Sequence, residues 1–417
     1  MKYIVLIGDG MADRPNEALG GLTPLKKAVT VNMDRLASQG TVGIVRTVPP
    51  GFPPGSDVAN LCILGYNPAL YYCGRAPLEA ASMGISLGTT DVAFRCNLVC
   101  LNFDDEGKGV WSAKTVMEDY SSGHISTAEA GALIDSLNEH LADNQVSFYP
   151  GVSYRHLMLL KTQSSEEAES YVSLKCTPPH DITGRAASVY LPAGLGDKLV
   201  LDLMYRSIDV LKDHPVNVKR KSEGKRAANS IWLWGQGRRP AMPTFKERYG
   251  IEGALISAVD LTKGLGVYAG FKIIKVPGVT GYLDTNYTGK AAYGIEALKD
   301  VDFIYIHVEA PDEAGHSGKL DDKLKAIEDF DSLVVGNVVE GLKGLKDDYR
   351  ILLMPDHATP LSLKTHTDEP VPFVIYDSRH PVDNGKISYD EDIANMKDVK
   401  VFDEGYKLMD YFINPQQ

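Results

Sequence analysis

The sequence lacks any apolar run near the roughly 20 residues that a membrane-spanning helix needs. Its first residues, MKYIVLIGDG, hold a short apolar segment that ends in Gly-Asp-Gly. The small-residue cleavage site of a secretory signal peptide is missing from this segment. We therefore predict a buried first strand here, and a protein that works without a membrane.

Cysteine is scarce, and the spacing of the cysteines disfavours a disulfide framework. The five cysteines are an odd number and form no paired CxxC motif: Cys62, Cys73, Cys96, Cys100 and Cys176. A disulfide framework and a structural zinc cluster are therefore not expected. Reduced thiols favour a cytoplasmic location.

Positive charge is also in short supply. Lysine and arginine number 43 against 55 aspartate and glutamate residues, which gives a net charge of −12. Such a balance disfavours broad binding of nucleic acid or of an anionic membrane surface. An anionic ligand must then be held by a local basic cluster or by metal ions.

The outer parts of the chain carry the pattern of an α/β domain. At 417 residues the chain exceeds a usual single core, so two domains are expected. Short apolar runs that end in turn or acidic residues predict strands buried on both faces of a parallel sheet, at 3–9, 303–312, 351–357 and 371–377. Helical patterns at 23–40 and 320–344 complete the expected βαβ arrangement.

The middle of the chain has a different pattern. Segments 95–103, 153–160 and 168–176 are predicted as strands, separated by polar loops and two helices. This change predicts a smaller α+β domain at 95–240, inserted into a discontinuous α/β core of 1–94 and 241–417. The fold class is therefore α/β, with a mostly parallel sheet flanked by helices and an inserted cap domain.

A stiff loop precedes the first candidate nucleophile. The stretch 49-PPGFPPG-55 can continue neither a strand nor a helix, and VANLCILG at 58–65 is predicted as a short helix. Ser56 or Asp57 stands where a helix N-cap belongs. The serine is then either only a cap or a hydroxyl that receives an anion such as phosphate.

Polar residues follow the predicted strands where a ligand would gather in an open α/β sheet. They are Asp9, Asp312, Asp356 and His357, joined by His316 four residues after Asp312 and by His366 in the loop before the last apolar run. Each signal alone is weak, because Asp9 fits a turn and a DxxxH pair is often coincidental. Together the six side chains and the Ser56 hydroxyl suffice for two divalent cations.

This mixture of ligands indicates a chemistry. Carboxylate and imidazole ligands suit Mn²⁺ or Zn²⁺ better than Ca²⁺. Two such ions can clamp the attacking and leaving oxygens of a phosphoryl transfer. An ion on Ser56 would also make its hydroxyl a nucleophile.

A basic segment lies at the end of the predicted insertion. Residues 212–239 contain eight lysines and arginines against two acidic residues, and the run at 219–225 is interpreted as a solvated face. Arg238 and Arg239 follow IWLWGQG, where a guanidinium could bind a carboxylate or phosphate in bidentate fashion. The two tryptophans there are either core residues or a ligand wall.

Other candidate substrate contacts of the insertion are Arg155, Arg185 and His124. The segment that contains His124 also fits a simple helix start, with Ser126 or Thr127 as its cap.

The order of motifs GDG, GSDVAN, PDEAGHSG, PDH and THTDEPVPF resembles the alkaline-phosphatase superfamily. Four longer segments resemble the archaeal-type cofactor-independent phosphoglycerate mutases, and the resemblance extends over nearly the whole chain: 7-IGDGMADRP-15, 52-FPPGSDVANLCILGYNP-68, 229-NSIWLWGQGRRP-240 and 280-TGYLDTNYTGKA-291. The resemblance implies an alkaline-phosphatase-like core, a phosphorylated small acid as substrate, and no requirement for 2,3-bisphosphoglycerate.

The resemblance also implies a role for each motif residue. Ser56 matches the phosphorylated serine, and Lys290 matches an active-site lysine that stabilises charge on the transferred group. Without the resemblance, a lysine in this glycine-rich segment would be interpreted as solvated. One ion would be held by Asp9, Ser56, Asp356 and His357, and the other by Asp312, His316 and His366. Mn²⁺ is expected, with Zn²⁺, Co²⁺ and Mg²⁺ as alternatives.

The leading functional hypothesis is a phosphoglycerate mutase in which Ser56 takes the phosphoryl group from 3-phosphoglycerate and returns it to the 2-hydroxyl of the trapped glycerate. A cap that excludes water would protect the phosphoserine. A homoserine-kinase-like transferase and a phosphatase remain alternatives with the same metal core. A sulfatase is disfavoured because GSDVAN lacks a CxPSR-like context. A metal-binding or anion-binding protein without catalysis would need the ligands but no nucleophile.

Overall fold

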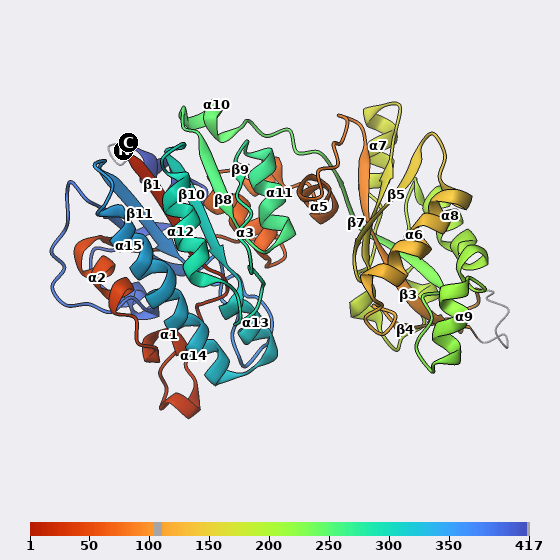
Figure 1. Ribbon diagram of the computed structural model, residues 1–417, viewed down its shortest axis with the longest axis horizontal. Coiled ribbons are helices and arrows are strands. Elements are labelled where there is room, and N and C mark those ends of the chain that lie inside the picture. Colours follow the sequence, from red (N-terminus) through yellow and green to blue (C-terminus); the bar gives the residue numbers. More distant parts are fainter. Residues whose placement is uncertain (104–110, 415–417) are drawn as a thin grey trace. The chain divides into compact units, whose positions relative to one another are not determined.

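The computed structural model describes residues 1–103 and 111–414 and divides the chain into two compact units (Figure 1). The first unit is discontinuous and consists of residues 1–72 and 241–417. The second unit consists of residues 73–240. Along the part of the chain that is described, no helix is both long and apolar enough to cross a membrane.

The first unit is built on an eight-stranded sheet (Figure 1). In sheet order its strands are β13 (Lys400–Phe402), β2 (Thr41–Val45), β12 (Val371–Asp377), β11 (Tyr349–Met354), β1 (Lys2–Gly8), β10 (Phe303–Val308), β8 (Gly253–Ile256) and β9 (Lys272–Ile273). Strand β1 pairs in parallel with both β10 and β11, so that Ile7 lies between His307 and Met354. These three strands therefore deliver their carboxyl ends to one edge.

The prediction of an α/β fold with a mostly parallel sheet is confirmed, with one local exception. Strand β12 runs antiparallel to both of its neighbours, β11 and β2. The segment between β11 and β12 contains turns and no helix, whereas the connection between parallel strands is usually a helix. The prediction of a parallel strand at 371–377 was therefore wrong in direction.

Helices cover the sheet of the first unit. They are α1 (Pro24–Lys27), α2 (Val31–Gln39), α3 (Ser56–Ile63), α4 (Pro68–Tyr71), α10 (Phe245–Tyr249), α11 (Asp260–Tyr268), α12 (Tyr287–Ala297), α13 (Ala310–Ser317), α14 (Leu320–Asp329), α15 (Gly336–Leu342) and α16 (Lys407–Ile413). The pattern at 23–40 forms two helices because the chain is extended at Ala28. The pattern at 320–344 forms α14 and α15, joined by a π-helical segment at Phe330–Val335.

Both faces of the central strands are buried. Ile4 and Leu6 of β1 belong to a cluster that includes residues of α2, α12, α14 and α15. The alternate residues Val5 and Ile7 are fully buried as well. Side chains of a strand alternate between the two faces of a sheet, so the continuous apolar runs seen in the sequence reflect a sheet covered on both sides.

The second unit is an antiparallel sheet covered by helices. Its strands are β3 (Val92–Asn102), β4 (Val116–Asp119), β5 (Val146–Val152), β6 (Arg155–Leu160) and β7 (Ser230–Arg238), and its helices are α5 (Arg75–Ser82), α6 (Thr127–Leu141), α7 (Ser165–Val172), α8 (Asp197–Leu211) and α9 (Pro215–Ser222). Strand β3 is central and pairs with β4, β6 and β7. Its core includes Leu98, Leu133 of α6, Leu203 of α8 and Trp232 of β7.

The prediction of a strand at 168–176 was wrong, because most of this segment belongs to helix α7. Ser164 caps the helix by accepting a hydrogen bond of 3.2 Å from the backbone N–H of Glu167. Glu166 and Glu167 in the first turn also favour a helix start. These local signals outweigh the apolar alternation in AESYVSLKC.

The predicted domain boundary at 94/95 falls inside β3, and the second unit begins at Cys73 instead. Helix α5 explains the difference. Its residues Ala76 and Ala80 pack against Ala93 of β3 and Leu157 of β6. The helix therefore belongs to the inserted unit.

The interpretation of 219–225 as a solvated face was wrong at Arg220. This residue is 3% exposed. Its guanidinium donates to the carbonyl of Ser122 at 2.6 Å, to the carbonyl of Arg226 at 2.8 Å and to the Glu129 carboxylate at 2.9 Å. Arg220 thus ties α9 to α6 and to the turn before it.

Candidate metal centre

The residues predicted at the strand ends lie at one edge of the sheet of the first unit. Asp9 follows β1, Asp356 and His357 follow β11, and Asp312 lies in α13 just after β10. The turn after Asp9 requires glycine. Gly10 has a φ of +59°, and a Cβ there would lie 2.5 Å from both Oδ1 of Asp312 and Oγ1 of Thr359. Glycine at position 10 therefore allows the turn after β1 to lie close to Asp312 of α13 and to Thr359 in the segment after β11.

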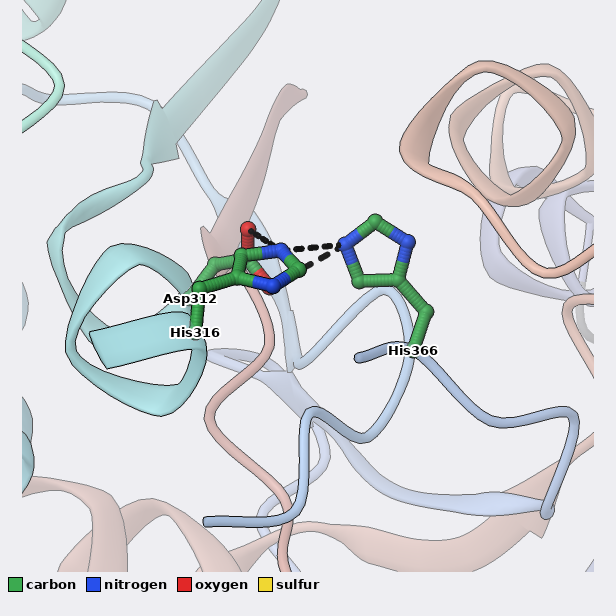
Figure 2. Close-up of side chains that lie close together, drawn as sticks. All are labelled: Asp312, His316 and His366. Atoms are coloured by element: carbon green, nitrogen blue, oxygen red, sulfur yellow. Dashed lines mark hydrogen bonds and ion pairs between the residues drawn. The ribbon is translucent and has the colours of Figure 1, made fainter. Parts of the chain in front are cut away.

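Asp312, His316 and His366 form one cluster, and Figure 2 shows the two imidazoles and the carboxylate converging. Nε2 of His316 lies 3.1 Å from Oδ2 of Asp312 and 2.9 Å from Nε2 of His366. Nε2 of His366 lies 3.4 Å from Oδ1 of Asp312. Nδ1 of His316 contacts the carbonyl of Lys364 at 3.0 Å. A proton on Nδ1 would leave the lone pair of Nε2 for the cluster.

A second cluster surrounds the hydroxyl of Ser56. Nε2 of His357 lies 3.1 Å from Oγ of Ser56, 3.5 Å from Oδ1 of Asp9 and 3.6 Å from Oδ2 of Asp356. Thr359 links the two clusters, because its hydroxyl donates to Oδ1 of Asp312 at 2.5 Å and lies 3.3 Å from Nδ1 of His357. The two clusters are therefore neighbours in one continuous site.

The charge of this site is poorly balanced by protein groups alone. Burial raises the pKa of Asp9 well above its ordinary value, and the carboxylates of Asp356, Asp312 and Glu309 raise it further. Burial also raises the pKa of Asp312, but hydrogen bonds from His316 and His366, together with the charges of His357 and His366, hold the pKa well below its usual range. Among the described residues, none donates a hydrogen bond to Oδ1 of Asp9. Buried carboxylates and imidazoles with unused acceptor atoms fit divalent cations.

Ser56 is presented by the start of α3, but it does not cap the helix. Gly55 is the N-cap residue and no side chain caps this end, so the prediction of Ser56 or Asp57 as the cap was wrong. Asp57 is buried and accepts a hydrogen bond of 2.7 Å from the hydroxyl of Tyr72. The Ser56 hydroxyl is therefore not used by the helix and faces the cluster.

Asn60 was missed by the sequence analysis. Its Nδ2 donates to Oδ2 of Asp356 and to the carbonyl of Ser56, each at 2.8 Å, and its Oδ1 accepts from the hydroxyl of Tyr305. It lies four residues after Ser56, on the same face of α3. The four-residue spacing from Ser56 was the sequence signal that could have identified Asn60 as a residue of the site.

Lys290 is buried in α12, which excludes the alternative interpretation as a solvated lysine. Its ammonium group donates to the carbonyl of His307 at 2.7 Å. Burial lowers the pKa of Lys290 to about 8, against the opposing influence of Glu309 and Asp9. Lys290 is therefore close enough to Asp9 for the carboxylate to influence its pKa.

A buried ion pair holds the two loops that carry the site. Nζ of Lys323 donates to Oδ2 of Asp13 at 2.7 Å and to the carbonyl of Thr359 at 2.7 Å. Asp13 in turn accepts from the backbone N–H of Leu361 at 3.1 Å. Lys323, in α14, therefore connects the loop after β1 with the loop after β11.

We expect Lys323→Met to lower the free energy of unfolding by about 3–5 kcal/mol, because it leaves the buried Asp13 carboxylate without its counter-charge. Urea denaturation of the two proteins at pH 7 measures the difference. The double variant Asp13→Asn/Lys323→Met is the matched control and should recover part of the loss. Equal stability of Lys323→Met and the wild type would show that the pair does not hold the loops.

The predicted substrate contacts all lie in the second unit. Arg238 bonds the Glu169 carboxylate at 3.1 Å, and the guanidinium of Arg155 lies 5.4 Å from the ring centre of Tyr154. Arg239, Arg185 and His124 are exposed. The contacts of these five residues with a substrate remain predictions.

The two tryptophans of β7 differ in their surroundings. Trp232 is fully buried in the core of the second unit. Trp234 lies next to His180, with 5.5 Å between ring centres, and the guanidinium of Arg95 lies 4.3 Å from its ring. The core interpretation therefore holds for Trp232, while Trp234 also borders a partly exposed imidazole.

Comparison with known proteins identifies related sequences. Residues 37–217 match the family described as 2,3-bisphosphoglycerate-independent phosphoglycerate mutase. A protein of that name from Methanosarcina acetivorans is 54% identical over 392 residues, which cover 94% of each chain. A protein from Methanothermobacter thermautotrophicus, named 2,3-bisphosphoglycerate-independent phosphoglycerate mutase 2, is 48% identical over 100% of this chain and 98% of its own length.

A solved structure resembles this chain over its whole length. The cofactor-independent phosphoglycerate mutase from Thermoplasma acidophilum superimposes with a TM-score of 0.67. The two sequences are 25% identical, and the match covers 100% of each chain.

Proposed function

Because the chain belongs to the 2,3-bisphosphoglycerate-independent phosphoglycerate mutase family, we propose that it interconverts 3-phosphoglycerate and 2-phosphoglycerate through a phosphoserine on Ser56. The observation that carries this proposal is the position of the Ser56 hydroxyl. It stands at a helix N-terminus that no side chain caps, 3.1 Å from Nε2 of His357 and beside two carboxylate and imidazole clusters. A nucleophile with this surrounding suits phosphoryl transfer.

The two clusters are proposed to hold two divalent metal ions. Asp9, Ser56, Asp356 and His357 would hold one, and Asp312, His316 and His366 the other. When bound, the ions supply positive charge to the transferred phosphoryl group and favour ionisation of the Ser56 hydroxyl. The mixture of carboxylate and imidazole ligands favours Mn²⁺, with Zn²⁺, Co²⁺ and Mg²⁺ as alternatives.

Ser56 carries the covalent chemistry in two steps. In the first, Oγ loses its proton and forms a bond to phosphorus while the bond from phosphorus to the 3-oxygen of glycerate breaks, and the 3-oxygen gains a proton. In the second, the 2-oxygen of glycerate loses its proton and forms the new bond to phosphorus, while the bond from phosphorus to Oγ breaks and Oγ regains a proton. The backbone N–H groups at the uncapped start of α3 favour the negative charge in both steps.

Lys290 is proposed to stabilise the charge that develops on the phosphoryl group. This proposal is supported by the buried position of Lys290 and by its electrostatic interaction with Asp9, a proposed ligand of the ion at Ser56. The basic residues of the second unit, Arg238, Arg239, Arg185, Arg155 and His124, are proposed to bind the anionic groups of the substrate. Retention of the freed glycerate protects the phosphoserine from water.

An assay of 2-phosphoglycerate formation coupled to enolase tests the proposal. With 3-phosphoglycerate and Mn²⁺ and without 2,3-bisphosphoglycerate, we expect turnover that disappears after chelation and returns when Mn²⁺ is added. Release of inorganic phosphate without 2-phosphoglycerate would instead identify a phosphatase. No turnover from a folded, metal-loaded sample would refute the mutase and make homoserine the next acceptor to test.

A further inference from the structure

We propose that Nε2 of His307 is a further ligand of the metal ion at Ser56, which gives this ion two imidazole ligands, His307 and His357. The inference rests on the two-ion site proposed above and deepens it. His307 carries no signal of a ligand in the sequence, because the residue lies inside an apolar strand and not beyond its end.

His307 occupies an unusual place for an imidazole. It lies in the central strand β10, directly beside Ile7 of β1, and its side chain is fully buried. The other residues of this strand are apolar or aromatic, in the order Phe-Ile-Tyr-Ile-His-Val. A polar ring buried at such a position needs partners for both of its nitrogens.

Only one of the two nitrogens has a hydrogen-bond partner among the described residues. Nε2 lies 3.2 Å from Oδ2 of Asp9 and 3.9 Å from Oδ2 of Asp356, but it forms no hydrogen bond with either carboxylate. Oδ1 of Asp9 is likewise without a donor. Two unsatisfied atoms of neighbouring side chains thus face the same buried space, and a cation would serve both.

The spacing of these atoms agrees with a single ion shared with His357. Ligands bound at about 2.1 Å from one ion lie roughly 3 to 4.2 Å from one another. Nε2 of His307 lies 3.2 and 3.9 Å from the two carboxylate oxygens, and Nε2 of His357 lies 3.5 and 3.6 Å from carboxylate oxygens of the same two residues. Each imidazole therefore lies at ligand spacing from carboxylate oxygens of Asp9 and Asp356, and Asp9, His307 and Asp356 can converge on one ion.

The other nitrogen of His307 has the partner that a metal-binding histidine needs. Nδ1 lies 3.3 Å from the hydroxyl of Ser257, which itself accepts a hydrogen bond of 3.0 Å from the backbone N–H of Val259. Donation from Nδ1 to Ser257 fixes the proton on Nδ1 and leaves the lone pair on Nε2. A second imidazole also favours Mn²⁺, Co²⁺ or Zn²⁺ over Mg²⁺.

Pulsed electron paramagnetic resonance of bound Mn²⁺ tests the proposal by counting coordinated imidazole nitrogens. The full-length double variant His316→Ala/His366→Ala removes the imidazoles of the other cluster and isolates the ion at Ser56. We expect two coordinated imidazoles in this background. Adding His307→Asn should reduce the count to one and weaken Mn²⁺ binding by at least the roughly 10- to 100-fold that loss of an outer partner costs.

One coordinated imidazole in the double variant itself would overturn the proposal. This count needs no substitution at His307, so it decides the matter even if His307→Asn fails to fold. An unchanged count of two in His307→Asn, with weaker binding, would also overturn it and make His307 a positioning residue.

His156→Asn in the same background is the control, because His156 is a buried histidine of the second unit that accepts a hydrogen bond from Gly151. It should leave the count at two. The count of imidazoles requires no turnover. His307 can therefore prove not to be a ligand while the wild type shows mutase activity, and it can prove to be a ligand while the wild type shows none.

Discussion

Ser56→Ala is expected to lower kcat for mutase turnover at least about 10⁴-fold, because it removes the atom that carries the phosphoryl group. The same change should leave the fold almost unaffected. The Ser56 side chain does not cap α3, and alanine is a good helix former. Metal binding should persist through Asp9, Asp356 and His357. The coupled assay, metal titration and thermal unfolding of the variant measure these three effects.

Ser164→Ala provides the matched control for Ser56→Ala. Ser164 does cap its helix, so its loss should cost about 1 kcal/mol of stability. It lies outside the proposed site, and turnover should stay at the wild-type level. If Ser56→Ala kept more than a few per cent of wild-type turnover, Ser56 would not be the nucleophile.

Asp9→Asn is expected to have opposite effects in the presence and absence of metal. Without metal, Asp9 is a buried carboxylate whose ionisation is disfavoured by burial and by Asp356 and Asp312. Removal of its charge should raise the free energy of unfolding of the metal-free protein by at least about 1 kcal/mol. With metal, the variant should bind Mn²⁺ roughly 100-fold more weakly and lose turnover to a similar degree or more.

Urea denaturation with and without Mn²⁺ measures both effects of Asp9→Asn, because a ligand that binds only the folded state stabilises it. Asp13→Asn is the matched control in the same loop. Asp13 is paired with the buried Lys323, so its neutralisation should destabilise the metal-free protein. Metal-free destabilisation by Asp9→Asn would contradict the account of a site built for cations.

The strand ends were the part of the site most accessible from the sequence. Asp9, Asp312 and Asp356 each follow an apolar run, and the rule that parallel strands end at one edge was enough to group them. His316 lies four residues after Asp312, a spacing that left a shared helix and a shaped loop equally open, and the structure has both residues in α13. These predictions depended only on local pattern and on the class of the fold.

Other features depend on tertiary packing and left no local signal. His307 and Tyr305 belong to an apolar strand. Their polar atoms find hydrogen-bond partners only in other elements, Ser257 after β8 and Asn60 in α3. In the sequence, Lys323 is one of several charged residues of an amphipathic helix. In the structure it is fully buried, and its charge is paired with Asp13. The domain boundary was misplaced because α5 is adjacent in sequence to the first unit but packs on the sheet of the second.

The most direct test of the central claim is to trap the phosphorylated enzyme. The metal-loaded protein is mixed with excess 3-phosphoglycerate labelled at its phosphorus, quenched in acid within milliseconds, and mapped by peptide mass spectrometry. The account predicts one labelled phosphoryl group on Ser56, formed no more slowly than turnover and recovered on 2-phosphoglycerate when the reaction continues. Full turnover with the label on another residue, or with no labelled enzyme at any time, would contradict it.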